Sequence, residues 1–216
     1  MSYIHKTLSI ENVGKANYIL KVEKKDVKFK AGQFFSVGIP NLIINREYSV
    51  CSGEKENQLE FLIREIDGGI LSKQLKNLKV NDPVKILGPY GNFYIKNFDL
   101  KKDYIFIASG TGISPFMSLI KTNPNLNYKL FHGIRYIEDS INNLINDKYL
   151  RFISREKKDI KNCFHGRITE YLNFLENENK DSFVFLCGNS QMVTEVYDKL
   201  INLNFKSKNI FTEIFF

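Results

Sequence analysis

The chain has 216 residues, of which 43% are hydrophobic and 25% are charged, and this composition supplies enough apolar side chains for a folded core. Its 31 lysines and arginines outnumber its 24 acidic residues, and the formal net charge of +7 suits an acidic partner, a phosphorylated ligand or nucleic acid. The composition excludes intrinsic disorder, and no apolar run approaches the roughly 20 residues that a membrane span requires.

Short apolar runs, rich in β-branched and aromatic residues, fill the chain up to about residue 98, with glycine, proline, asparagine and aspartate between them. This spacing predicts an antiparallel sheet or a small barrel. One helix is expected in this half, over Gly69–Leu78, because Leu71, Leu75 and Leu78 recur at helical spacing. The helix would cap the barrel. The apolar runs lie at 18–23, 33–39, 46–52, 59–66 and 83–87.

From about residue 103 the pattern changes to fully apolar runs that alternate with amphipathic segments. Such alternation is typical of a parallel sheet that helices cover on both faces. We therefore predict a two-domain β plus α/β protein, with an antiparallel β-barrel and one capping helix in residues 1–99 and a doubly wound parallel sheet in residues 100–216. The predicted strands are 104–109, 128–134, 149–154 and 183–188, and the predicted helices are 115–121 and 191–201.

The turn Gly110–Thr111–Gly112 stands between a predicted strand and a predicted helix, with Ser114 as the candidate N-cap and Pro115 at the first helical position. Such a turn aims backbone N–H groups at a phosphate or a flavin edge, and glycine lets the ligand approach closely. The turn departs from the standard dinucleotide fingerprint, because Pro115 replaces the third glycine and no acidic residue ends the next strand. A tight strand-to-helix turn without a ligand is the alternative.

Arginines follow the next two predicted strands. Arg135 comes after one and Ser154–Arg155 ends the other, at the carboxyl ends where a doubly wound sheet binds ligands. Together with Arg167, three guanidinium groups and a hydroxyl would surround one dianionic phosphate, which would select NADPH over NADH. The alternative is that each arginine is a solvated surface charge.

Two segments of the first half are candidates for a cofactor site. Arg46 and Tyr48 lie on one face of a strand by alternation, so that Arg46 would hold a pyrophosphate while Tyr48 packs on a ring. Gly68–Gly69 opens the single predicted helix, and Ser72 adds a hydroxyl that would receive a second phosphate. A plain strand and a plain turn are the alternatives.

The three cysteines, Cys51, Cys163 and Cys187, are far apart and form no CxxC pair. This spacing favours neither a zinc nor an iron–sulfur site, and the odd number argues against a disulfide framework. We expect no metal site and a cytoplasmic location, since the N-terminus has no long apolar segment behind its charges.

Taken in order, these motifs resemble the ferredoxin–NADP reductase family of flavoproteins, in particular its compact bacterial ferredoxin/flavodoxin reductases. The resemblance covers nearly the whole chain, and its motifs also fit the predicted barrel and parallel sheet. They are REYS at 46–49, LEFLIREIDGGILS at 59–72, GPYG at 88–91, SGTGISPF at 109–116, HGIR at 132–135, SRE at 154–156, GRIT at 166–169, CGN at 187–189 and TEIFF at 212–216.

The resemblance implies that FAD binds the barrel and that NADP(H) binds the α/β domain as co-substrate. The residues that match FAD-binding positions are Arg46, Tyr48, Ser49, Leu62, Ile63, Gly69, Leu71, Ser72 and Thr111. The residues that match NADP-binding positions are Gly110, Gly112, Arg135, Ser154, Arg155, Arg167, Cys187, Gly188 and Asn189.

The resemblance also implies which side chains surround the site of hydride transfer: Ser49, Cys187 and Glu213. For Cys187 the alternative is a small buried hydrophobic residue. The family usually ends in Tyr, or in Tyr and then Trp, whereas Phe215 and Phe216 stand here. We expect these two to shield the flavin, with Phe215 as the better candidate for direct stacking; two phenylalanines ending a core strand are the alternative.

The expected function is that of a ferredoxin/flavodoxin–NADP(+) reductase, a monomer that docks an acidic ferredoxin or flavodoxin. One alternative is an NAD(P)H-dependent reductase subunit that supplies electrons to an oxygenase or another enzyme. A nucleic-acid-binding barrel is a further alternative, but it leaves the second domain and its phosphate-shaped turns without a role.

Overall fold

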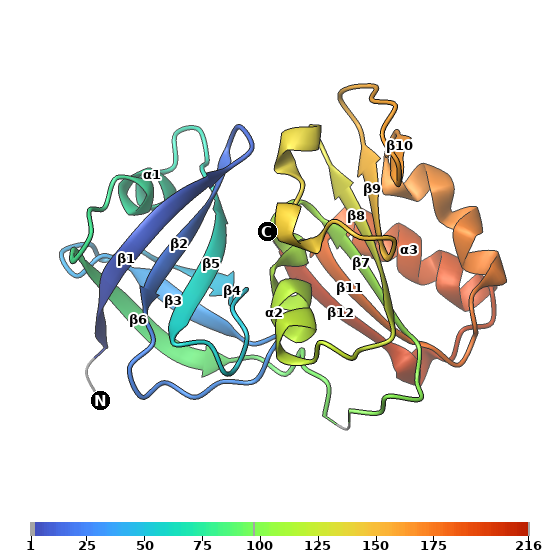
Figure 1. Ribbon diagram of the computed structural model, residues 1–216, viewed down its shortest axis with the longest axis horizontal. Coiled ribbons are helices and arrows are strands. Elements are labelled where there is room, and N and C mark those ends of the chain that lie inside the picture. The colour runs from blue at the N-terminus through green and yellow to red at the C-terminus, as the bar shows by residue number, and fades with distance from the viewer. Residues whose placement is uncertain (1–2, 97, 216) are drawn as a thin grey trace. The chain divides into compact units, whose positions relative to one another are not determined.

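The computed structural model describes residues 3–96 and 98–215, which form two compact units (Figure 1). The first unit extends to Lys96 and also contains Ser114–Pro124, and the second contains the remaining described residues, up to Ile113 and from Asn125 onward. The predicted division between residues 99 and 100 lies near the point after Lys96 where the chain passes from the first unit to the second. The sequence does not predict that Ser114–Pro124 packs with the first unit.

The first unit is built on six antiparallel strands in the order β4-β3-β6-β1-β2-β5. A bridge between Val50 and Phe61 joins the two ends of this order, so the sheet closes into a barrel. The strands are β1 (Ile4–Val13), β2 (Asn17–Glu23), β3 (Phe34–Gly38), β4 (Asn45–Ser49), β5 (Gln58–Arg64) and β6 (Pro83–Tyr90).

Alternation along these strands builds the core of the barrel. In β2 every second residue is buried, and the same face of β5 is fully buried, so apolar side chains converge on the interior. The fully buried residues of these two strands are Tyr18, Leu20, Val22, Leu59, Phe61 and Ile63. The helix α1 (Ile70–Lys76) packs Leu71 and Leu75 onto this core, which confirms the predicted capping helix.

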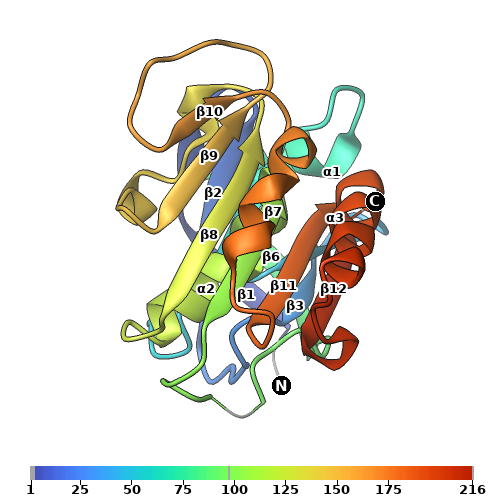
Figure 2. The ribbon, with the colours of Figure 1, turned by 90° about the vertical axis from the view of Figure 1, so that its right-hand side faces the viewer.

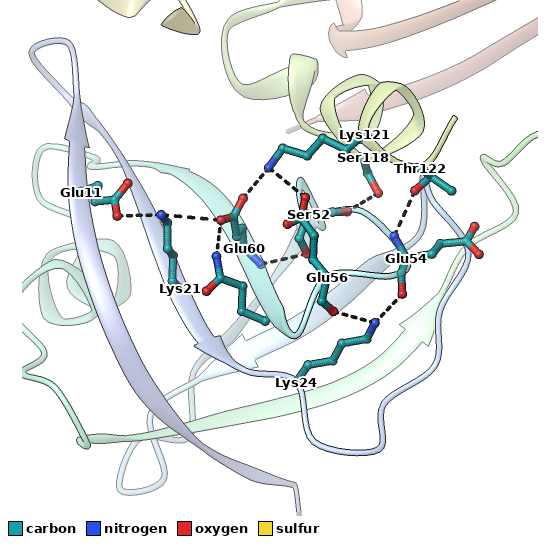
Figure 3. Close-up of polar contacts among 11 residues, drawn as sticks. Glu11, Lys21, Lys24, Ser52, Glu54, Glu56, Glu60, Ser118, Lys121 and Thr122 are labelled. Atoms are coloured by element: carbon teal, nitrogen blue, oxygen red, sulfur yellow. Dashed lines mark hydrogen bonds and ion pairs between the residues drawn. The ribbon is translucent and has the colours of Figure 1, made fainter. Parts of the chain in front are cut away.

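Helix α2 (Ser114–Thr122) is fastened to the loop 51–56 and to β5 of the barrel by polar contacts (Figure 3). The Lys121 ammonium lies 2.6 Å from the Glu60 carboxylate, and the Ser118 hydroxyl donates to the carbonyl oxygen of Ser52 at 2.6 Å. The hydroxyl of Thr122 accepts a hydrogen bond from a backbone N–H of the loop at 3.0 Å. These contacts explain why the helix belongs to the first unit.

The second unit is a six-stranded parallel sheet in the order β10-β9-β8-β7-β11-β12 (Figure 2). The chain starts at β7, proceeds outward to β10, and then returns to β11 beside β7, so the direction of winding reverses between β7 and β11. The elements are β7 (Tyr104–Ser109), β8 (Tyr128–Ile134), β9 (Tyr149–Ile153), β10 (Cys163–His165), β11 (Phe183–Asn189), α3 (Ser190–Asn202) and β12 (Ile210–Phe215).

The described part of the second unit also contains the 3₁₀ segments η1 (Gly110–Ile113), η2 (Ile137–Asp139), η3 (Asn142–Leu144), η4 (Ile168–Asn177) and η5 (Ser207–Asn209). Helix α3 and η4 pack together on one face of the sheet, where Ile105, Ile107 and Leu186 are buried. The predicted fold class, a barrel followed by a parallel α/β sheet, is therefore confirmed. Within the described ranges, no helix is long and apolar enough to cross a membrane.

Candidate functional site

The turn that follows β7 leads from a strand into a helix, as predicted, but the helical turns begin earlier than predicted. Gly110 adopts a left-handed backbone conformation, with φ of +55°, and no described heavy atom lies within 4 Å of where its Cβ would stand. The helical turns begin at Gly110 as η1 and continue directly into α2. Ser114 is therefore the buried first residue of α2 within a continuous helical run, and the prediction that it caps the helix is wrong.

The turn after β7 interlocks with the turn after β11. A Cβ on Gly112 would lie 2.4 Å from the carbonyl oxygen of Cys187, and a Cβ on Gly188 would lie 2.1 Å from the Ser109 hydroxyl. The same hydroxyl accepts a hydrogen bond from the backbone N–H of Asn189 at 3.0 Å. Gly112 and Gly188 are thus required by close backbone packing at the point where the winding of the sheet reverses, which is where open α/β sheets bind ligands.

One residue from each of the six parallel strands is paired in register with the next to form a row, and Cys187 and Ala108 are among these residues. Because partners in neighbouring strands point to the same face, these side chains share one side of the sheet. From β12 to β10 the row comprises Glu213, Cys187, Ala108, His132, Arg151 and Cys163.

Cys187 and Glu213 are brought together by this register. The Cys187 thiol donates to Oε2 of Glu213 at 3.9 Å, and Cys187 itself is fully buried. Burial, and then the negative charge of Glu213, raise the pKa of the thiol well above its ordinary value, so Cys187 is protonated at neutral pH. Phe215 is the register partner of Asn189, two residues beyond this pair. Phe216 lies outside the described residues.

The predicted phosphate-binding residues follow three adjacent strands. Arg135 follows β8 directly, Ser154 and Arg155 follow β9, and Arg167 comes two residues after β10. The backbone N–H of Arg155 donates to the carbonyl oxygen of Arg135 at 3.1 Å, which fixes the first two segments side by side. All four side chains are exposed at the carboxyl edge of the sheet. The Ser154 hydroxyl donates to the carbonyl oxygen of Ile134 at 3.2 Å.

In the first unit, the REYS motif forms most of β4. Arg46 and Tyr48 pair with the buried residues Val37 and Phe35 of β3, so the two share a strand face. Arg46 is exposed, and its guanidinium donates to the neighbouring Asn45 carbonyl oxygen at 2.9 Å. Tyr48 packs against the core, and burial raises the pKa of its hydroxyl to about 12 against the opposing effect of Arg46. A cation and a half-buried aromatic ring thus lie together on β4, the first strand in the order of this sheet.

The second predicted FAD segment surrounds the start of α1. Gly68 has a φ of +75° with no described heavy atom within 4 Å of its Cβ position, and Gly69 is the N-cap residue of α1. The Ser72 hydroxyl accepts a hydrogen bond from the backbone N–H of Ile66 at 3.1 Å, which leaves its proton to donate. The buried Tyr18 hydroxyl donates to the Ser72 carbonyl oxygen at 2.6 Å and holds this turn against the barrel.

Leu62, Ile63 and Leu71 are buried in the first unit. Ser49 also lies in the first unit and is buried, whereas Thr111, Cys187 and Glu213 belong to the second. Each predicted site residue that the structure describes therefore belongs to one of the two units.

Two features of the structure had no signal in the sequence. The strand β10 is only three residues long and contains too few residues to show alternation. The buried side chains of His132 and Arg151 stand in strands that otherwise read as apolar, and their hydrogen-bonding partners lie far along the chain. Among the described residues, no group of three or more His, Cys, Asp or Glu side chains is arranged to hold a metal ion.

Comparison with known proteins agrees with both units. Residues 3–95 match the family model described as the oxidoreductase FAD-binding domain. The flavodoxin/ferredoxin–NADP reductase of Buchnera aphidicola subsp. Baizongia pistaciae is 34% identical over 200 residues, which cover 81% of this chain and 80% of that protein. The toluate 1,2-dioxygenase electron transfer component of Pseudomonas putida is 27% identical over 87% of this chain, which spans only 59% of that relative.

Among solved structures, a ferredoxin NADP+ reductase from Neisseria gonorrhoeae with bound FAD and NADP superimposes with a TM-score of 0.82, at 21% identity and over the full length of both chains. This likeness confirms the fold, and the identity to the Buchnera protein confirms the resemblance found in the sequence motifs. The chain belongs to the ferredoxin/flavodoxin–NADP reductase family of FAD-containing oxidoreductases.

Proposed function

We propose that the protein is a ferredoxin/flavodoxin–NADP(+) reductase, which passes electrons between NADP(H) and a one-electron carrier by hydride transfer to or from the flavin. The observation that carries this proposal is the placement of Arg135, Arg155 and Arg167 after three adjacent strands. Guanidinium groups match the geometry of a phosphate dianion, and the adenosine 2′-phosphate is the group that distinguishes NADPH from NADH.

The first unit has residues that fit FAD. Gly68 leaves open space at its Cβ position, the Ser72 hydroxyl keeps its proton to donate, and Arg46 presents an exposed guanidinium on β4. We infer that Arg46 and Ser72 contact the pyrophosphate, that Tyr48 packs on the flavin, and that Ser49, Leu62, Ile63, Gly69 and Leu71 complete the site. Bound FAD would supply the hydride and electron chemistry, and the chain's own residues would bind and orient the reactants.

In the second unit, Gly110 and Gly112 line the turn that would receive the nicotinamide nucleotide, together with Cys187, Gly188 and Asn189. The protonated Cys187 thiol, held by Glu213, would shape the approach of the nicotinamide without acting as a base. Thr111 and Phe215 would contact the flavin, Phe215 by stacking on it. Phe216, outside the described residues, would shield the flavin as well.

A reductase subunit that serves an oxygenase is the second candidate function. The similarity to the toluate 1,2-dioxygenase electron transfer component over 87% of this chain favours it. The two candidates differ in coenzyme, because oxygenase reductases often use NADH, and the arginine set favours NADPH.

Anaerobic titration of the purified protein with NADPH, and in parallel with NADH, tests the proposal. Bleaching of the flavin absorbance by stoichiometric NADPH, with a much weaker response to NADH, is the expected result. Equal bleaching by NADPH and NADH would favour the reductase subunit of an oxygenase. A protein that neither retains nor binds added flavin would contradict both candidate functions.

The partner that fits this charge is an acidic ferredoxin or flavodoxin, since the formal net charge of the chain is +7. All three cysteines are free thiols, which supports a reducing compartment such as the cytoplasm. We expect a monomer that binds no nucleic acid.

A further inference from the structure

We propose that His132 is a positioning residue that holds the Gly110–Ile113 turn in the conformation that binds the nicotinamide nucleotide. This inference rests on the proposed function, because it assigns a role to a turn whose ligand is proposed above. His132 lies in the middle of the parallel sheet, in the same row as Cys187 and Glu213, and it is 1% exposed.

The imidazole joins the turn to the strand β9. Nε2 of His132 lies 2.8 Å from the Gly110 carbonyl oxygen, and Nδ1 lies 2.7 Å from the Tyr149 hydroxyl. A carbonyl oxygen only accepts hydrogen bonds, so Nε2 must carry the proton. In the neutral ring Nδ1 then accepts from the Tyr149 hydroxyl. The backbone N–H of Ile141 points at the same hydroxyl from 3.4 Å.

Arg151 supports this protonation state. Its guanidinium lies over the Tyr149 ring at 5.5 Å, and Nη2 donates to the Lys161 carbonyl oxygen at 2.9 Å, while Nε is buried without a hydrogen-bond partner. Burial lowers the pKa of His132 to about 4, and the nearby positive charge of Arg151 acts in the same direction. The ring is therefore neutral at physiological pH and donates from Nε2.

The hydrogen bond acts on the residue of the turn that most needs a restraint. Gly110 has a φ of +55° and no described heavy atom near its Cβ position, so side-chain packing does not hold its backbone. Glycine also loses more conformational freedom on ordering than any other residue. A donor fixed at the Gly110 carbonyl sets the orientation of the Gly110–Thr111 peptide before the ligand arrives.

Two amide substitutions separate the two hydrogen bonds of the ring. In His132→Gln the amide nitrogen reaches the position of Nε2 and still donates to Gly110. In His132→Asn the shorter amide reaches only the position of Nδ1, so the contact with Gly110 is lost. Tyr149→Phe keeps the ring stacking and removes only the hydroxyl that orients the imidazole.

The dissociation constant of NADP+ is measured on the flavin-loaded protein, from the perturbation of the flavin spectrum, for the wild type and the three variants. We expect affinity to fall about tenfold in His132→Asn and about threefold in Tyr149→Phe, and to change little in His132→Gln. Retained FAD and a cooperative thermal transition well above the assay temperature in each variant show that the loss concerns the turn and not the fold.

Equal affinity in His132→Asn and His132→Gln, whether weakened or not, would overturn the positioning role while wild-type binding of NADP+ upheld the proposed function. Absence of NADP+ binding in the wild type would instead overturn the proposed function itself. If His132→Asn does not fold, the ¹⁵N chemical shifts of the imidazole in the wild type decide the matter. A proton on Nε2 supports the inference, and a proton on Nδ1 contradicts it.

Discussion

At the scale of single residues, the proposed preference for NADPH over NADH rests on guanidinium groups at the edge of a sheet. Arg135, Arg155 and Arg167 follow three different strands, which only the fold makes neighbours. A charge-assisted hydrogen bond to a phosphate is worth more than a neutral one, so the loss of one arginine should be measurable on the phosphorylated coenzyme alone.

Arg155→Ala should raise the Michaelis constant for NADPH and leave that for NADH almost unchanged. The lost contact is worth about 1.5–3 kcal/mol, or roughly tenfold or more in kcat/KM for NADPH. Steady-state kinetics with both coenzymes provide the measurement. Lys157→Ala removes a positive charge from the same exposed loop and serves as the matched control. Equal losses with both coenzymes would refute the phosphate assignment.

Arg46→Ala should weaken the retention of FAD, because the exposed guanidinium on β4 would no longer meet a pyrophosphate. We expect the dissociation constant of FAD to rise about tenfold or more, measured by the recovery of flavin fluorescence on dilution. Lys28→Ala removes an exposed cation elsewhere in the first unit as a control. A variant that purifies with full flavin would count against the role of Arg46.

His132 should make the protein sensitive to acid. Its pKa is about 4 in the fold and 6.5 in the unfolded chain, so between these values the unfolded state binds the proton and the folded state does not. The stability due to this group is complete above pH 6.5 and is lost as the pH falls toward 4. Between pH 7 and pH 5 the loss is about 2 kcal/mol.

Urea unfolding of the wild type and of His132→Gln at pH 7 and pH 5 measures this contribution. The wild type should lose about 2 kcal/mol more than the variant over this interval. The comparison between the two is needed because burial also lowers the pKa of His5, which acts in the same direction. Parallel pH dependences would show that His132 is already protonated in the folded protein near pH 5.

At the scale of elements, α2 differs most from its expected role. It is the crossover helix between two strands of the parallel sheet, yet it packs with the barrel. Glu60 is 5% exposed and Lys121 ties it to the helix. Burial alone would raise the pKa of Glu60, but hydrogen bonding and charge from Lys121 outweigh it and lower the pKa.

Removal of both partners of the Lys121–Glu60 pair should cost less stability than the two single removals added together. Glu60→Gln and Lys121→Met should each lower the free energy of unfolding by about 2 kcal/mol, because each leaves a partly buried charge with only the longer contact to Glu56 or to Lys21. The double variant should lose less than the sum, as measured by a urea double-mutant cycle. Lys206→Met breaks an exposed pair with Asp181 and should change stability by less than about 1 kcal/mol. Additive losses in the cycle would show that the pair is not coupled.

At the scale of the whole molecule, the surplus of positive charge is the property that would affect binding of an electron carrier. The formal net charge of +7 would steer an acidic carrier toward the reductase, and salt screens such steering.

We expect kcat/KM for reduction of an acidic flavodoxin to fall about tenfold as ionic strength rises from about 0.02 M to 0.2 M. Reduction of a neutral quinone under the same conditions should change little, and this acceptor serves as the control. A flavodoxin rate that is independent of salt would contradict electrostatic docking.

The sequence by itself determined the types of most elements, the order of the two units and the family, but it predicted neither β1 nor β10. The reason is that alternation, helical spacing and glycine turns are local signals, readable in windows of a few residues. Thus β2, β5 and α1 were predictable from their own residues. Arg46 and Tyr48 were also placed correctly on one strand face, since alternation alone requires it.

Only the tertiary structure decided which distant residues meet. Cys187 reaches Glu213 across 26 residues, His132 reaches Gly110 across 22, and Lys121 reaches Glu60 across 61. No local preference encodes these contacts, because they depend on which strands become neighbours and in what register. From the sequence alone, His132 is one residue of an apolar strand. Its role is visible only when the fold brings Gly110 within hydrogen-bonding distance.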